Sequence, residues 1–304
     1  MEFLSFAQSW SNALRAHGLR SRTQERSGRI SPRRKALIGL TRLIIFLHIP
    51  KTAGTTFRFI LESSFGLTHC HAGHLDKRVF GQSDLDLARK IFPGLRSIAG
   101  HNLVNPLSLS VPDPCYMTFV REPVARVFSH YQESVMTGKN RLSFEQSLRS
   151  NEKLENLHVK LMAGERSLDK AKRFLEKCAF VGVTEKFDLS LHVLERLSPY
   201  HLDPYYQPRR LAVDNRIKTS LERDGAMIDL AKEFNRLDLE LYDFALGEIL
   251  PKLCEKAGLS PSEKVASYDN RSKRVKFKYR LGRFYNKMVY RQICKWQLRK
   301  TGKV

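Results

Sequence analysis

The chain has 304 residues, of which 42% are apolar and 28% charged, so it can fill the core of one large α/β domain or two small ones. Its five cysteines are widely spaced and include no C-x-x-C pair. This spacing excludes a disulfide framework and a zinc cage, and it indicates reduced thiols. The formal net charge of +22 raises the question of an anionic partner.

The basic residues are concentrated at the two ends of the sequence. Residues 1–42 hold nine Lys/Arg and two acids, and residues 271–304 hold thirteen Lys/Arg and no acid, which leaves +2 for the 228 residues between them. We expect a basic N-terminal arm at 1–42, a central domain at 43–265 and a basic C-terminal segment at 266–304. The near-neutral middle, without a recognisable nucleic-acid module, disfavours a specific nucleic-acid partner.

Neither a targeting segment nor a membrane span is expected. The first residues lack a charged stretch followed by an apolar run, as a signal peptide would have. The most hydrophobic window, 36–50, is interrupted by Arg42 and is shorter than the roughly 20 residues that a spanning helix needs. We therefore expect a cytoplasmic protein.

Apolar runs in the central region alternate with segments of helical periodicity. The runs at 43–48, 96–100, 115–120 and 179–183 are nearly uninterrupted, as in strands buried on both faces. The first, third and fourth runs are followed by apolar residues at helix spacing, and the pattern in residues 221–258 predicts further helices. This order predicts an α/β fold with a central parallel sheet flanked by helices. Proteins with such a sheet bind their ligands at the carboxyl ends of the strands.

The segment "HIPKTAGTT" (48–56) joins the first expected strand to the first expected helix. Backbone N–H groups and the positive end of a helix converge on an anion in such a place. Lys51 supplies a mobile cation, Gly54 permits close backbone approach, and Thr55 and Thr56 can cap the helix and donate hydroxyls. The plainer alternative is a tight turn with a solvated lysine.

A nucleoside triphosphate is one candidate ligand for this loop. The Walker A loop G-x-x-x-x-G-K-[ST] places its lysine directly after the second glycine, with a hydroxyl beside it for Mg²⁺. Here Lys51 comes three positions before Gly54, and no glycine opens the loop. This order disfavours a P-loop kinase or NTPase, which remains one alternative; a polyanion-binding protein acting through its basic arms is another.

The loop resembles the 5′-phosphosulfate loop of the carbohydrate sulfotransferase family that includes heparan sulfate 2-O-sulfotransferases and many bacterial relatives. A second motif, "FVREPVARVFSHY" (119–131), is similar to the family's 3′-phosphate site. That site has an arginine at a strand end, then an acid and a proline, and a serine eight positions after the arginine. The residues that fit are Arg121, Glu122, Pro123 and Ser129. Alternatively, Arg121 forms a structural ion pair with Glu122 or another acid.

Three weaker matches extend the resemblance over residues 43–250. They are "NLHVKLMAG" (156–164), "GVTEKFD" (182–188) and "LDLELYDFA" (237–245). In the first of them, His158 and Lys160 stand where the family usually has Gln and Arg, so the contacts of these two side chains do not follow from the family.

The resemblance implies a P-loop-containing sulfotransferase fold and a defined reaction. A sulfuryl group would move from 3′-phosphoadenosine-5′-phosphosulfate (PAPS) to a hydroxyl of a carbohydrate-type acceptor by in-line displacement, without a metal ion. Lys51 would neutralise charge on the leaving oxygen. The residues implied to bind PAPS are Lys51, Thr52, Ala53, Gly54, Thr55, Thr56, Arg121 and Ser129.

The reaction needs a base, because the acceptor alcohol loses its proton as its oxygen attacks sulfur. Histidine suits this role, since its unperturbed pKa is about 6.5. The family places a Gly-His just after a central strand, so the resemblance implies that His101, after Gly100, is the base. The following residues lack the aromatic and glycine often seen there, and we expect a different acceptor pocket. The sequence identifies neither the acceptor nor the oligomeric state.

A second histidine group, "HCHAGH" (69–74), comprises His69, Cys70, His71 and His74. If the segment is extended, His69 and His71 share a face, and such ligands suit Zn²⁺ or Cu. No complementary ligand cluster occurs elsewhere in the sequence. We therefore expect no metal site and favour a surface or acceptor-side role.

Near the C-terminus, Lys or Arg recurs at every fourth residue from Arg283 to Arg299, while apolar residues favour another side. This pattern predicts a basic amphipathic helix. The helix can lie on an anionic membrane as a peripheral contact at the inner face, attract an acidic polysaccharide, or pack on the domain. These alternatives stay open.

Overall fold

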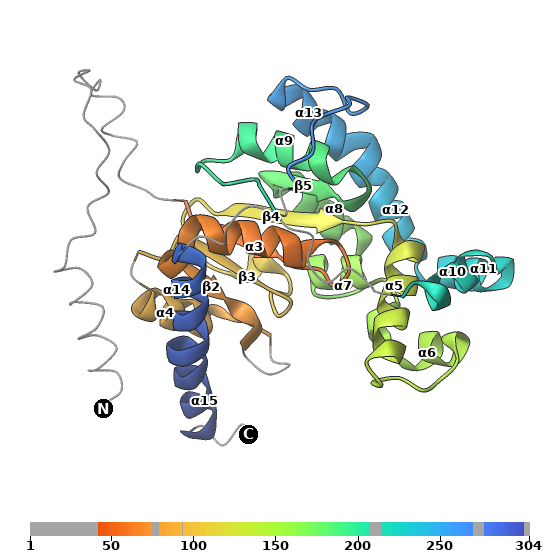
Figure 1. Ribbon diagram of the computed structural model, residues 1–304, viewed down its shortest axis with the longest axis horizontal. Coiled ribbons are helices and arrows are strands. Elements are labelled where there is room, and N and C mark those ends of the chain that lie inside the picture. The colour runs from red at the N-terminus through yellow and green to blue at the C-terminus, as the bar shows by residue number, and fades with distance from the viewer. Residues whose placement is uncertain (1–41, 75–78, 93, 207–213, 270–276, 301–304) are drawn as a thin grey trace.

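The computed structural model is organised around a five-stranded parallel sheet with the strand order β2-β3-β1-β4-β5 (Figure 1). The strands are β1 (Ile44–Leu47), β2 (His69–His71), β3 (Ser97–Gly100), β4 (Cys115–Val120) and β5 (Phe180–Val183). The structure describes residues 42–74, 79–92, 94–206, 214–269 and 277–300. The expected N-terminal arm therefore lies, except for Arg42, outside the described residues.

The four apolar runs form strands, as predicted, and the α/β fold class is confirmed. β1 lies at the centre, where Ile44 is in register with Ser97 of β3 on one side and with Cys115 of β4 on the other. All four residues of β1 are buried, because the sheet is covered on both faces. β2 was not predicted, since this edge strand has only three residues and two of them are histidines.

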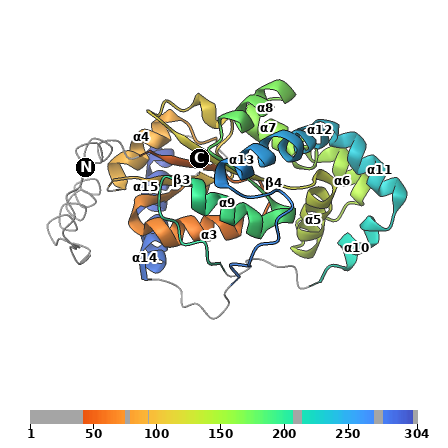
Figure 2. The same ribbon diagram turned by 90° about the horizontal axis from the view of Figure 1, so that it is seen from above.

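Helices cover both faces of the sheet, with α3 and α9 on one side and α4, α7 and α8 on the other (Figure 2). The α-helices are α3 (Gly54–Phe65), α4 (Gln82–Ile91), α5 (Pro123–Met136), α6 (Phe144–Ser150), α7 (Leu157–Ala163), α8 (Leu168–Lys177), α9 (Phe187–Leu197), α10 (Arg216–Glu222), α11 (Gly225–Phe234), α12 (Arg236–Phe244), α13 (Leu250–Ala257), α14 (Phe277–Tyr285) and α15 (Arg291–Lys300). Short 3-10 turns are Gly66–Thr68, Ala72–His74, Pro106–Ser108, Glu152–Leu154 and Thr184–Lys186, and π-helical segments are Ala245–Ile249 and Asn286–Tyr290.

A small helical lobe extends from the end of β4 and consists of α5, α6, α10 and α11 (Figure 1). It has its own apolar cluster, in which Phe128 of α5 packs against Phe144 of α6 at a centroid distance of 5.1 Å. The rest of the lobe therefore packs against α5, whose first turn lies close to the end of β4.

Within the expected C-terminal segment 266–304, residues 277–300 form α14, a π-helical turn and α15, and this helix packs on α3 and on the turn that follows α3. The approach is close, because a Cβ atom on Gly282 would come within 2.6 Å of the backbone oxygen of Gly66. Packing on the domain, one of the three alternatives for this helix, is thus observed. No helix of the described residues combines the length and the apolar character needed to cross a membrane.

Candidate functional site at the carboxyl end of the sheet

The loop after β1 has an unusual backbone. Lys51 (φ 70°) and Ala53 (φ 58°) both adopt the left-handed conformation, which is uncommon for residues with a Cβ and is concentrated at functional sites. Thr52 between them is fully buried, and its hydroxyl donates to the carbonyl oxygen of Ile49 at 2.9 Å. The Thr52 side chain therefore holds the loop in shape.

α3 begins directly from this loop, with Ala53 as its N-cap and no side chain bonded to the cap. The expectation that Thr55 and Thr56 cap the helix is wrong, because the helix starts earlier and both lie in its first turn. Thr56 donates its N–H to the carbonyl oxygen of Ala53 at 2.9 Å. The N–H groups ahead of it, on Gly54 and Thr55, precede the hydrogen-bond ladder of the helix, and N–H groups in this place suit an anion.

Gly54 is required by a close contact that the sequence did not indicate. A Cβ atom on Gly54 would lie 2.0 Å from Cδ2 of His48, whose ring is buried under the start of α3. Gly54 is predicted to permit a close approach to the backbone. In the structure, the group that lies close to Gly54 is the His48 ring.

Arg121 joins the second motif to the loop. It follows β4, the neighbour of β1, and its Nη1 donates to the backbone carbonyl oxygen of Lys51 at 3.0 Å. Burial lowers the pKa of its guanidinium, and Glu185 and Glu122 counteract that shift. Arg121 remains charged at physiological pH, since the ordinary pKa of arginine is 12.5 or higher.

α5 turns a polar face toward the same loop. Ser129 and Glu133 are one helical turn apart on this face, and the Glu133 carboxylate lies 3.5 Å from Nζ of Lys51. The intervening His130 is half-buried. Its pKa is lowered to about 4, first by this burial and then by the charge of Arg126, while Glu133 opposes the shift and Lys51 adds to it. Ser129 therefore lies on the side of α5 that faces Lys51.

The acid that pairs with Arg121 is Glu185. Glu122 instead caps α5, accepting the N–H groups of Val124 at 3.0 Å and Ala125 at 2.6 Å, with Pro123 at the first helical position as predicted. The Glu185 carboxylate lies 3.8 Å from Nε of Arg121. Arg121 thus makes both a structural ion pair and a contact with the loop.

Glu185 also connects two of the weaker sequence matches. Its second oxygen accepts a hydrogen bond from the Tyr242 hydroxyl at 2.9 Å, which links segment 182–188 to segment 237–245. Burial, followed by the charge of Glu185, raises the pKa of Tyr242, so this hydroxyl remains a donor at neutral pH.

His101 follows β3, on the other side of β1, and is exposed. Its Nδ1 lies 2.7 Å from the backbone carbonyl oxygen of His48, and the two imidazole rings are 3.9 Å apart. Because a carbonyl oxygen can only accept, Nδ1 carries the proton and Nε2 is the basic nitrogen. His101 is therefore held beside the loop in the tautomer that a general base needs.

The second histidine group is mostly structural. His69 and Cys70 are fully buried, so a surface role is wrong for them, and burial lowers the pKa of His69 to about 3, with Arg58 adding to the shift. His71 makes a 2.7 Å contact from Nε2 to Arg58 of α3. Within the described residues, no group of three His, Cys, Asp or Glu side chains could hold a metal ion.

The sequence reasoning overlooked three side chains of this site: His48, Glu133 and Glu185. His48 is the first residue of the segment 48–56, and Glu133 lies one helical turn after Ser129. The proximity of both residues to the predicted motifs could therefore have indicated them. Glu185 is distant in sequence from Arg121, and only the packing of β5 against β4 brings it close.

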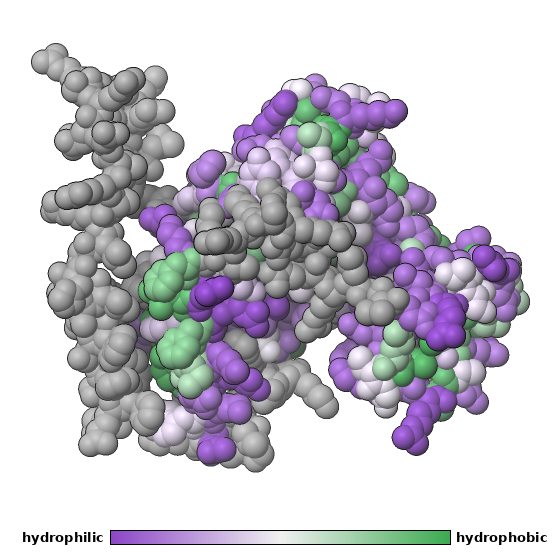
Figure 3. Space-filling view, viewed as in Figure 1, coloured by the Kyte–Doolittle hydropathy of each residue, from purple (hydrophilic) through white to green (hydrophobic). Residues whose placement is uncertain are grey.

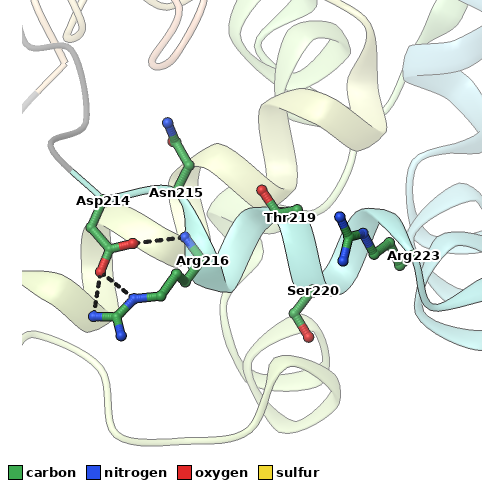
Figure 4. Close-up of a pocket in the computed structure, with 6 residues that line it drawn as sticks. All are labelled: Asp214, Asn215, Arg216, Thr219, Ser220 and Arg223. Carbon is green, nitrogen blue, oxygen red and sulfur yellow. Dashed lines mark hydrogen bonds and ion pairs between the residues drawn. The ribbon is translucent and has the colours of Figure 1, made fainter.

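A pocket of about 560 Å³ lies along α10, and none of the predicted site residues lines it (Figure 4). Asp214 accepts bonds from the backbone and from Nε of Arg216, each at 2.8 Å. α10 contacts α5 through Gln132 and Asn215 at 3.2 Å. The pocket lining consists of Asp214, Asn215, Arg216, Thr219, Ser220 and Arg223.

Comparisons with known proteins are sparse. No family model and no curated protein matches the chain. A search of solved structures finds a sulfotransferase from Alicyclobacillus acidocaldarius, with 15% sequence identity, a TM-score of 0.35, and coverage of 66% of this chain and 97% of that one. This match is too remote to assign a family or an activity. What the geometry defines is an α/β protein with a strand–loop–helix site at the carboxyl end of its parallel sheet.

Proposed function

We propose that this protein is a sulfotransferase that moves the sulfuryl group of PAPS to a hydroxyl of a carbohydrate-type acceptor. The observation that carries the proposal is the 3.0 Å hydrogen bond from Arg121 to the Lys51 carbonyl. This bond joins two motifs that suit phosphate groups, and His101 directly follows β3, the strand on the other side of β1. Two phosphate sites beside a base fit a nucleotide with a phosphate at its 3′ and 5′ positions better than they fit a triphosphate.

The donor set suits PAPS in its chemistry. The N–H groups at the start of α3 and the Lys51 ammonium favour the 5′-phosphosulfate end. The guanidinium fork of Arg121 and the Ser129 hydroxyl suit the 3′-phosphate. PAPS would supply an activated sulfuryl group, and none of these residues requires a metal ion to bind it.

The protein's contribution to the reaction is to move one proton and stabilise one negative charge. Nε2 of His101 takes the proton of the acceptor hydroxyl as the acceptor oxygen forms its bond to sulfur. The bond between sulfur and the bridging oxygen breaks, and its electron pair stays on that oxygen. Lys51 and the N–H groups of the loop stabilise the charge that develops there.

Calorimetry tests the choice of nucleotide. Adenosine 3′,5′-bisphosphate, the product of the proposed reaction, is expected to bind without Mg²⁺. Tight binding of Mg-ATP with no binding of the bisphosphate would instead support a kinase or NTPase.

Two variants test the mechanism, with labelled PAPS and a panel of glycans, lipid-linked sugars and small hydroxyl compounds as acceptors. A key donor of this kind contributes about 3 to 4 kcal/mol, so Lys51→Ala should lower turnover on the order of a hundredfold or more. His101→Ala should lower turnover by a similar factor and leave bisphosphate binding unchanged. Exposed Lys139 on the loop after α5 supplies the control Lys139→Ala. Normal transfer by both test variants would refute the mechanism.

A further inference from the structure

The C-terminal helix has two apolar faces, and the described part of the chain packs on only one of them. Side chains on the inner face join the main core of the protein; they include Tyr285, Tyr290, Ile293 and Cys294. On the outer face, Phe277, Phe284 and Met288 are 77%, 61% and 49% exposed. Their spacing of seven and four residues places them along one side of the helix.

The π-helical turn accounts for this division of faces. Tyr285 and Tyr290 both point into the core, although they are five residues apart rather than three or four. The turn Asn286–Tyr290 accommodates the extra residue, so the inner face stays in contact with the domain along its whole length.

Asn286 fixes the helix on the sheet edge. Its amide nitrogen donates to the carbonyl oxygen of His69 at 3.0 Å, and its amide oxygen accepts the N–H of His71 at 2.8 Å. Both partners belong to β2. The helix therefore cannot turn its outer apolar side chains inward without breaking these buried bonds.

The outer face is also strongly basic. Arg280 and Lys287 are exposed beside the apolar side chains, and residues 271–304 contain no Asp or Glu. Figure 3 shows apolar groups next to hydrophilic ones over α14. A face of this composition needs a partner that offers both negative charge and a hydrocarbon layer.

We propose that this outer face binds an anionic lipid surface. Phosphate headgroups complement the lysines and arginines, while the aromatic and Met side chains enter the acyl boundary. An acidic polysaccharide would satisfy the charges but leave Phe277, Phe284 and Met288 in water. The N-terminal arm is a poor occupant, because residues 1–42 carry a net charge of +7 and repel a second basic segment.

Vesicle flotation of the full chain tests this surface. Binding is expected to vesicles of phosphatidylcholine with phosphatidylglycerol, and much less to phosphatidylcholine alone. Arg280→Gln with Lys287→Gln should weaken binding about 25-fold, because each basic residue near the headgroups contributes about fivefold. Phe277→Ser with Phe284→Ser should weaken it on the order of tenfold or more. The matched controls are Lys139→Gln with Arg141→Gln for charge and Leu142→Ser for exposed apolar area, all three being exposed residues on another face.

Tryptophan emission gives a second, independent measurement. The chain has two tryptophans, Trp10 and Trp296, and Trp296 lies exposed on α15. In a Trp10→Phe variant, emission should shift to shorter wavelength when anionic vesicles are added and should not shift with neutral ones.

Three outcomes would overturn the proposal. They are equal binding to neutral and anionic vesicles, unchanged binding by both sets of outer-face variants, and retention on a sulfated polysaccharide without any binding to vesicles. The test is independent of sulfuryl transfer, so its result does not depend on the proposed enzymatic function.

Discussion

Asp238 of α12 holds the first turn of α7 through His158. One carboxylate oxygen accepts the backbone N–H of His158 at 3.0 Å and lies 2.8 Å from Nδ1 of its ring, while the other accepts the N–H of Val159 at 2.9 Å. Both side chains are buried. The segments 156–164 and 237–245, each of which resembles a sulfotransferase segment, are thus connected by one buried joint, the hydrogen bonds from His158 and Val159 to Asp238.

The joint should be important for stability. Removing one partner of a buried pair leaves the other unsatisfied, so Asp238→Ala should lower the free energy of unfolding by about 3 to 5 kcal/mol. The matched control is Asp229→Ala on α11, which breaks an exposed pair with Lys232 at 3.6 Å and should cost less than about 1 kcal/mol. Urea titration compares the two variants, and equal midpoints would show that the joint is not special.

The same carboxylate should make stability depend on pH. Burial alone raises the pKa of Asp238, but the hydrogen bond and electrostatic interaction with His158 and the charge of Arg126 outweigh burial and lower the pKa below 3.8. A lowered pKa means that Asp238 contributes stability above its unfolded value of 3.8, and that this contribution is lost as the pH falls through its folded value. Urea midpoints of the parent and of Asp238→Asn should therefore converge below about pH 4. A constant difference down to pH 3 would contradict this assignment.

The sheet could be predicted from the sequence where burial imposes a uniform apolar run. The run at 115–120 forms β4 with the predicted bounds, because each of its residues is buried. β2 could not be found in this way, since it is short, and its histidines are tolerated only because Ser97 contacts one and Arg58 the other. Those partners come from other elements of the fold.

The candidate site could be predicted in part, for a similar reason. Lys51, Gly54 and Arg121 follow apolar runs, so their place at the strand ends follows from the pattern. The role of Glu122 as a cap, in place of an ion pair with Arg121, depends on where α5 begins. The position of Glu185 depends on the order of the strands, which the local sequence does not encode.

The contact of Lys51 with Glu133 predicts a variant that binds more tightly. The Glu133 carboxylate, 3.5 Å from Nζ of Lys51, competes with an incoming phosphate for the same cation. Glu133→Gln should therefore raise the affinity for adenosine 3′,5′-bisphosphate about two- to fivefold, and less in high salt. Calorimetry measures the effect, with Glu145→Gln on α6 as the matched control. Weaker binding by Glu133→Gln would mean that this carboxylate positions Lys51 instead.

Arg121 should distinguish ligands by their 3′-phosphate. Lysine lacks the planar fork of arginine, so Arg121→Lys should weaken the binding of adenosine 3′,5′-bisphosphate about tenfold or more. The affinity for adenosine 5′-monophosphate, which has no 3′-phosphate, should fall much less. Arg141→Lys, at an exposed site, is the control. An equal loss for both nucleotides would show that Arg121 acts by supporting the loop at the Lys51 carbonyl.

The contact of Gly54 with His48 predicts that these two positions are energetically coupled. A methyl group at position 54 would lie 2.0 Å from the His48 ring, so Gly54→Ala should cost about 1 to 3 kcal/mol of stability. It should also slow sulfuryl transfer, because the carbonyl oxygen of His48 holds His101 at 2.7 Å and the His48 ring lies 3.9 Å from the His101 ring, tilted against it by 37°. Gly225→Ala is the matched control, since a Cβ there meets no atom within 4 Å.

A double-mutant cycle separates this clash from a general effect of alanine at the start of α3. His48→Ala keeps the backbone carbonyl that His101 needs and removes the ring that the new methyl group would meet. The double variant should therefore lose about 0.5 to 3 kcal/mol less than the sum of the two single variants, measured by urea titration of all four proteins. If the losses simply add, the ring is not the reason for glycine at position 54, and the cost of Gly54→Ala must come from the backbone of the loop.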